Sequence, residues 1–196
     1  MNNDTSRYAE NIILIDASFL EFITSDFKKN FEHILNRKLE TIDISTLLTY
    51  ISLDGGFTAG KHQINALFIY DANSPILSVC APSSLSDELN NMAFHSPVGE
   101  IIMQSYSNED IAVIEDMFLD SLKLAVDSDN VKRMLVVGFY ERYGDKIKEV
   151  LKDSSGKNIT VFNVYPVSEK TPYRTECIAY PIMKALGITS DELETK

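Results

Sequence analysis

The sequence contains few of the residues that form disulfides or hold zinc: its 196 residues include two cysteines and three histidines. Cys80 and Cys177 are far apart and outside any metal-spaced motif, so we expect two free, buried thiols in a reducing compartment. This expectation indicates a cytoplasmic protein. The histidines are His33, His62 and His95, and none has the spacing of a metal site.

Long apolar segments are also missing. No apolar run approaches the length of a membrane span. The N-terminal stretch MNNDTSRYAEN is polar and has no apolar region typical of a signal peptide. We therefore expect no membrane association.

Positive charge is scarce. The formal net charge is −11 and the isoelectric point is about 4.7, whereas proteins that hold nucleic acid mainly through phosphates usually have a basic face. This argues against a dedicated nucleic-acid scaffold. It is compatible with an enzyme whose carboxylates bind a divalent cation, or with solubility alone. One basic group could contact a phosphate backbone or form a solvated helix face: Lys146, Lys148, Lys152 and Lys157.

Two common catalytic motifs are incomplete. The glycine-rich stretch DGGFTAGK, residues 54–61, does not follow a buried strand and lacks the Gly-Lys-Ser/Thr ending of a phosphate-binding loop. We interpret it as a connecting loop. Ser18 and Ser84 lie in no nucleophile elbow, so no Ser–His–Asp arrangement is indicated.

The sequence does contain an alternation of short apolar runs and helix-periodic segments. Continuous apolar runs are typical of strands buried on both faces, and apolar residues three or four positions apart are typical of amphipathic helices. We predict strands at 11–15, 65–70, 99–105, 133–137 and 158–164, and helices at 18–36, 44–52, 85–94, 109–126, 143–153 and 180–187.

This alternation predicts an α/β fold. We expect a three-layer α/β/α, Rossmann-like domain with a mainly parallel central sheet of about five strands, joined by right-handed crossovers. We place the domain at residues 1–166 and treat residues 167–196 as a C-terminal extension that packs on it or trails from it. In such folds ligands bind at the carboxyl ends of the strands.

Acidic residues follow several of the predicted strands. Asp16 and Asp71 directly follow the first two strands, and Glu141 lies shortly after the fourth. Asp110 and Asp116 lie on the helix after the third strand. A carboxylate at the end of a buried strand is costly unless it binds a cation, a hydrogen-bond donor or a helix N-terminus. Converging carboxylates would form an oxygen-lined site for Mg²⁺ or Mn²⁺.

A structural role is equally open for these acids. Asp16 and Asp110 each come before a predicted helix and could be its N-cap, and Asp43 is predicted to cap the helix at 44–52. Asp71 lies in YDANSP, a sequence that favours a turn. Taken singly, none of these acids is specific for a metal site.

Four stretches of the sequence, in their order along the chain, resemble the NYN family, a branch of the PIN-like nucleases. They are IILIDASFLEF, ALFIYDANSP, DIAVIEDMFLDSLKLA and RMLVVGFYERYGDKIKEVLKDSSGKNITVFNV, within residues 11–165. The resemblance implies a PIN-like fold and an endoribonuclease that hydrolyses RNA phosphodiesters with Mg²⁺ or Mn²⁺. It further implies that Asp16, Asp116 and Glu141 hold the ion, and that Asp110 orients water or a second ion.

The sequence departs from the NYN pattern at three places. Phe139 stands at the first acid of the family's Gly-Asp-x-Asp loop, and Phe19 stands where many members have an asparagine. SYSNE replaces the basic segment that often precedes Asp110. Two hypotheses follow. One is a divergent or impaired metal-dependent ribonuclease that binds RNA. The other is a non-catalytic PIN-like module that binds another protein or a second copy of itself.

Overall fold

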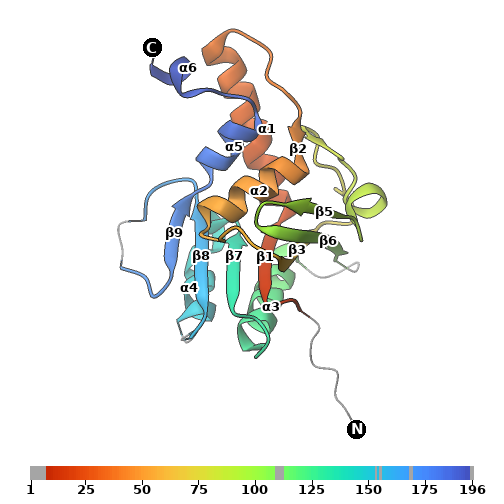
Figure 1. Ribbon diagram of the computed structural model, residues 1–196, viewed down its shortest axis with the longest axis vertical. Helices are drawn as coiled ribbons and strands as arrows, with labels where there is room; N and C mark the ends of the chain where they lie inside the picture. The colour runs from red at the N-terminus through yellow and green to blue at the C-terminus, as the bar shows by residue number, and fades with distance from the viewer. Residues whose placement is uncertain (1–7, 109–112, 153, 155, 168–169, 195–196) are drawn as a thin grey trace.

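The computed structural model describes residues 8–108, 113–152, 154, 156–167 and 170–194. Its centre is a seven-stranded sheet in the order β5-β6-β3-β1-β7-β8-β9 (Figure 1). Neighbouring strands pair in parallel except β5, which runs antiparallel to β6. The strands are β1 (Asn11–Asp16), β3 (His62–Tyr70), β5 (Ala93–Ser96), β6 (Gly99–Ser107), β7 (Arg133–Val137), β8 (Asn158–Asn163) and β9 (Arg174–Cys177).

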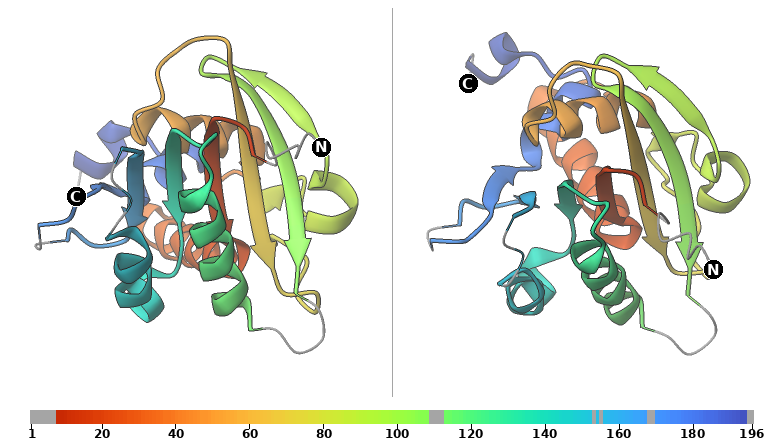
Figure 2. Two further views of the ribbon diagram at one scale, coloured as in Figure 1. Left: turned by 90° about the horizontal axis from the view of Figure 1, so that it is seen from below. Right: turned by 60° about the horizontal axis from the view of Figure 1, so that its bottom comes forward.

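Helices cover both faces of this sheet. They are α1 (Ala17–Leu35), α2 (Ile44–Asp54), α3 (Ile114–Asp127), α4 (Tyr140–Leu151), α5 (Ala179–Ala185) and the short α6 (Ser190–Glu194). The first core lies under α1, α2 and α5, and the second lies under α3 and α4, with the sheet between them (Figures 1 and 2). The predicted three-layer α/β/α fold is therefore confirmed. No helix in the described part of the chain is long and apolar enough to cross a membrane.

The central strand β1 shows why its sequence is apolar throughout. Ile13 and Ile15 belong to the first core, whereas Ile12 and Leu14 belong to the second, and all four side chains are fully buried. Because successive side chains of a strand point to opposite faces, a strand with helices on both sides needs apolar residues at every position. The strand then leads directly into α1, which places Asp16 at the carboxyl edge of the sheet.

The sheet contains two strands that the sequence did not predict, β5 and β9. Both are edge strands, and their side chains are half-buried or exposed, so neither forms a continuous apolar run. The helix predicted at 85–94 is instead a π-helix, η1 (Leu85–Leu89), followed by a turn into β5. Two further two-residue strands, β2 (Ile42–Asp43) and β4 (Cys80–Ala81), pair beside the main sheet.

The segment treated as a C-terminal extension takes part in the sheet and in the first core. β9 extends the sheet beside β8, and α5 packs against α2. Ile178, Ile182 and Leu186 are fully buried in the first core. Residues after 166 therefore contribute to the same hydrophobic core as the rest of the domain.

Cys80 and Cys177 are both free thiols, as expected. Cys80 is buried, whereas Cys177 is half-buried and its thiol lies 3.6 Å from the carbonyl oxygen of Val164. Burial, with the negative charge of Glu21, raises the pKa of the Cys80 thiol to about 12. Cys80 is therefore an unreactive core residue at neutral pH.

We predict that a chain shortened to residues 1–166 does not fold cooperatively. It loses Ile178, Ile182 and Leu186, and burying each such side chain stabilises a protein by about 1.5–3 kcal/mol. The sum is comparable with the whole stability of an ordinary domain, about 5–15 kcal/mol. Thermal unfolding monitored by circular dichroism measures the cooperativity and the midpoint of the transition.

A chain shortened to residues 1–188 is the control for this truncation. It keeps α5 and loses α6 with the partly exposed ion pair between Arg37 and Glu192, so its unfolding midpoint should stay close to that of the full chain. Cooperative unfolding of the 1–166 chain at an unchanged midpoint would show that the C-terminal segment is dispensable.

Candidate functional site

Asp16 is the junction between β1 and α1 at the carboxyl edge of the sheet. Its side-chain Oδ1 accepts hydrogen bonds from the backbone N–H groups of Ser18, at 2.9 Å, and Phe19, at 3.2 Å. Asp16 is therefore the N-cap of α1, which confirms the capping interpretation. Asp43 caps α2 in the same way, because its Oδ1 accepts from the N–H of Thr46 at 2.7 Å.

The second carboxyl oxygen of Asp16 is bound by a residue from the opposite helical layer. The hydroxyl of Tyr143 donates to Oδ2 of Asp16 at 2.5 Å and accepts from the backbone N–H of Phe139 at 3.0 Å. Tyr143 lies in α4 but has non-helical φ and ψ angles of −132° and 27°, so the helix is kinked at this residue. The hydroxyl thereby links the β1–α1 turn to the β7–α4 turn.

Burial controls the ionisation of this pair. It raises the pKa of Asp16 above the ordinary value of 3.8, although the hydrogen bonds from Tyr143, Phe19 and Ser18 and the charge of Arg142 act in the opposite direction. Burial and the negative charge of Asp16 also raise the pKa of Tyr143. The tyrosine hydroxyl therefore keeps its proton and remains a donor to the carboxyl group.

Aromatic rings pack together in the β7–α4 turn close to Asp16. The Phe139 ring centroid lies 5.1 Å from that of Phe19 and 5.5 Å from that of Phe22. The guanidinium of Arg142 lies 4.8 Å from the centroid of the Phe139 ring, on its face. Phe19 and Phe139, the two phenylalanines at which the sequence departs from the NYN pattern, are thus in mutual contact.

Asp116 and Glu141, the other predicted site acids that the structure describes, do not form a metal-binding group of three with Asp16. Asp116 and Glu141 are exposed in the first turns of α3 and α4, where a carboxylate stabilises the helix dipole. Among the residues that the structure describes, no three His, Cys, Asp or Glu side chains are placed to hold a metal ion. Asp110 lies outside the described residues, and binding of Mg²⁺ or Mn²⁺ stays a prediction.

Asp71 and the glycine-rich segment have structural roles. Oδ1 of Asp71 accepts from the backbone N–H of Asn73 at 2.8 Å, so the predicted turn is confirmed. The N–H groups of Gly55 and Gly56 donate to carbonyl oxygens at the end of α2, and the N–H of Phe57 donates to Ser52. These amides are used within the chain, in agreement with a connecting loop.

The basic group on and after α4 is mostly a solvated helix face. Lys146 pairs with Glu115 of α3 at 2.6 Å, Lys148 pairs with Asp145 at 3.2 Å, and Lys152 pairs with Glu149. The remaining lysine, Lys157, differs, because its ammonium donates to the backbone carbonyls of Ser128, at 2.6 Å, and Val131, at 2.7 Å.

A comparison with protein families identifies the family of this chain. The model of a family of unknown function, DUF6621, matches residues 5–193. The chain belongs to this family. No curated protein and no solved structure matches it. The resemblance to the NYN family is tested by none of these comparisons and stays a prediction.

Tyr143 is the site residue that the sequence did not indicate. The ends of the predicted strands point to acidic residues, whereas a tyrosine on the apolar face of a helix looks like an ordinary core residue. Its hydroxyl reaches Asp16 because α4 is kinked at Tyr143, directly before Gly144, and a single glycine within a helical segment is only a weak sequence signal for such a kink.

We predict that Tyr143→Phe lowers the free energy of unfolding by about 1–3 kcal/mol, because it leaves a buried carboxyl oxygen and the N–H of Phe139 without a partner. Urea denaturation measures the change. Tyr140→Phe is the control in the same helix: its hydroxyl has a long contact of 3.5 Å to that of Tyr173, so a much smaller loss is expected. Equal losses in the two variants would contradict the role of Tyr143.

The raised pKa of Asp16 gives a second prediction, for Asp16→Asn. As the pH rises, the unfolded chain loses the Asp16 proton before the folded chain does, so ionisation favours unfolding between the ordinary and the raised pKa. The variant does not titrate at this position. Its free energy of unfolding relative to the natural protein should therefore increase across this pH window and then level off, which urea denaturation at several pH values measures.

Asp43→Asn is the matched control, because Asp43 is also an N-cap but its pKa is lowered. Burial acts to raise that pKa, and the hydrogen bonds from Ser45 and Thr46 together outweigh it. The relative stability of this variant should fall as the pH rises through the window between the lowered pKa and the ordinary value of 3.8, which lies below the window of Asp16. If both variants follow the same pH trend, the assignment for Asp16 is wrong.

Proposed function

We propose that the protein is a non-catalytic α/β module that acts through binding of another protein, rather than an active ribonuclease. The observation that carries the proposal is the engagement of the Asp16 carboxyl group. Its two oxygens accept from Ser18, Phe19 and Tyr143 within the chain. A carboxylate that is to bind Mg²⁺ or Mn²⁺ needs an oxygen free to face the ion.

The neighbouring side chains support the same proposal. Phe139 takes the place of an acid expected in the NYN family, and its ring contacts Phe19 and Phe22. A catalytic metal site needs polar ligands held in exact positions, and a shift of the ion costs about 10²-fold in rate. Aromatic packing at this position therefore favours a structural role for these residues rather than a catalytic metal site.

The same edge offers a surface of the kind that partners bind. The Phe22 side chain is 54% exposed and stacks on Phe139, and the exposed Arg142 contacts the face of the same Phe139 ring. Aromatic and arginine side chains dominate the energetic centres of protein interfaces. The partner in this proposal is another protein or a second copy of the chain. Two free thiols favour action in the reducing cytoplasm.

We predict that the purified protein does not cleave RNA above background in Mn²⁺ or Mg²⁺, and that Asp16→Asn gives the same background. Incubation with a mixed-sequence RNA, with gel analysis of the products, measures cleavage. The unfolding midpoint should also respond equally to Mn²⁺ in the natural protein and in the variant, because Asp16 is occupied by protein donors.

The ribonuclease hypothesis makes the opposite prediction. Under that hypothesis Asp16, Asp116 and Glu141 hold Mg²⁺ or Mn²⁺, and RNA is the substrate. Metal-dependent cleavage that Asp16→Asn abolishes, together with a Mn²⁺-induced rise in the unfolding midpoint that the variant loses, would overturn the non-catalytic proposal. Light scattering after size-exclusion chromatography then measures the molecular mass of the protein in solution. A dimer would identify a second copy of the chain as the partner, whereas a monomer would favour another protein.

A further inference from the structure

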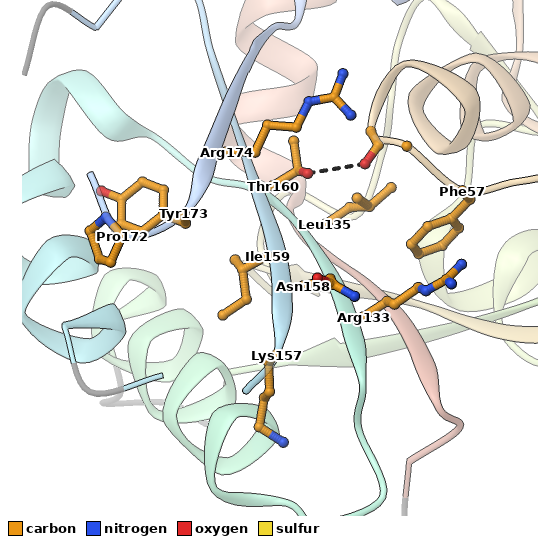
Figure 3. Close-up of a pocket in the computed structure, with 12 residues that line it drawn as sticks. Phe57, Arg133, Leu135, Lys157, Asn158, Ile159, Thr160, Pro172, Tyr173 and Arg174 are labelled. Atoms are coloured by element: carbon orange, nitrogen blue, oxygen red, sulfur yellow. Dashed lines mark hydrogen bonds between the residues drawn. The ribbon is translucent and has the colours of Figure 1, made fainter. Parts of the chain in front are cut away.

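A recess lies at the opposite edge of the sheet from Asp16. It has a volume of about 350 Å³, at the lower end of the usual range for small-molecule sites, ~300–1,000 Å³. Arg133, Asn158 and Arg174 line it, and each is the first residue of its strand, β7, β8 or β9 (Figure 3). The recess therefore lies at the amino edge of the sheet and shares no residue with the Asp16 site.

Strand register brings the polar side chains of this recess to one face. Arg133 is the partner of Asn158, and Thr160 is the partner of Arg174. Partners in adjacent parallel strands project to the same side of a sheet, and residues two apart in one strand do so too. The four side chains thus lie on the face that α2 covers, below the loop that follows α2.

The loop after α2 is held close to the sheet and forms one wall. The hydroxyl of Thr160 donates to the carbonyl oxygen of Gly55 at 3.0 Å, a bond drawn in Figure 3. A Cβ atom at Gly55 would come within 2.5 Å of the Leu135 side chain, and one at Gly56 would come within 2.7 Å of Nη1 of Arg174. Gly56 also has a φ of +92°, which favours glycine. The two glycines let the loop approach the sheet and the guanidinium of Arg174.

The charge of the recess is opposite to that of the chain. Three cationic side chains line it, those of Arg133, Lys157 and Arg174, and none of the described lining residues is acidic, in a protein of net charge −11. Arg174 pairs with Glu176 through Nε and Nη2, and Lys157 donates to two backbone carbonyls. Arg133 is half-buried, and its guanidinium has no hydrogen-bond or ion-pair partner within the described part of the chain.

We propose that this recess binds a small organic phosphate, with the guanidinium of Arg133 and the side-chain amide of Asn158 as donors to its phosphate group. A guanidinium recognises phosphate oxygens with two parallel hydrogen bonds, and Nη1 of Arg174 adds a donor from the opposite wall. The volume and the partly apolar lining, which includes Leu135, leave room for the organic part. The inference does not depend on the proposed function, because it concerns the other edge of the sheet.

A structural role for Arg133 is the competing explanation. The recess lies beside the C-terminal end of α2, where a positive charge stabilises the helix dipole. In that case Arg133→Gln would lower the stability of the ligand-free protein and leave phosphate binding unchanged. Affinity and stability therefore have to be measured separately.

The test uses ribose 5-phosphate as the probe, with isothermal titration calorimetry on the full chain at constant ionic strength. Saturable binding is expected, and Arg133→Gln should weaken it by about tenfold or more, as expected for the loss of a charge-assisted hydrogen bond. Asn158→Asp should weaken it at least as much, because it places a carboxylate beside the phosphate. Asn158 is exposed, so this second variant is expected to fold even if the first does not.

Lys29→Gln is the control, since it removes one positive charge from an exposed position of α1 and thus changes the net charge by the same amount as each test variant. It should leave the affinity unchanged. Equal effects of the control and the test variants, or no saturable binding at millimolar ribose 5-phosphate, would overturn the proposal. Equally tight binding of inorganic phosphate would overturn the assignment to an organic phosphate.

Discussion

The carboxyl group of Asp16 has to be satisfied without water, and the carboxyl edge of the sheet is arranged around this requirement. The residue is 3% exposed and follows a strand that is buried on both faces. Three donors meet the requirement: two N–H groups of α1 and the hydroxyl of Tyr143 in α4. Because these donors come from helices on opposite faces of the sheet, one carboxyl group couples both outer layers to the central strand.

This coupling has a consequence for the chemistry available at that edge. Oxygens that accept three internal hydrogen bonds are poor candidates for metal ligands unless the site rearranges, and the rings of Phe19 and Phe139 make such a rearrangement costly. The position is the one at which α/β sheets usually bind ligands. In this protein it joins the layers of the fold, and its outer surface is aromatic.

The two edges of the sheet therefore differ in whether their polar side chains are paired within the described part of the chain. At the carboxyl edge the polar group is buried and paired, whereas at the amino edge Arg133 is half-buried and has no partner among the described residues. An unpaired guanidinium beside a recess remains available to an anion from solution. The proposed small-molecule site thus lies at the edge opposite to the one at which α/β sheets usually bind such ligands.

Sequence alone determined the strands and helices whose signal is local. The apolar run of β1, the periodicity of α1 and the capping positions of Asp16 and Asp43 follow from neighbouring residues, and the structure confirms them. Edge strands were missed, because a strand such as β9 (RTEC) pairs with one neighbour only, and its half-buried or exposed side chains form no apolar run.

Tertiary structure decided which side chains meet. The bond from Tyr143 to Asp16 joins residues 127 positions apart and depends on a kink in α4. Arg133, Asn158 and Arg174 gather because three parallel strands begin at the same edge in a fixed register. Local sequence patterns report the periodicity and caps of one element, whereas a site requires the relative positions of several elements, which packing and register set.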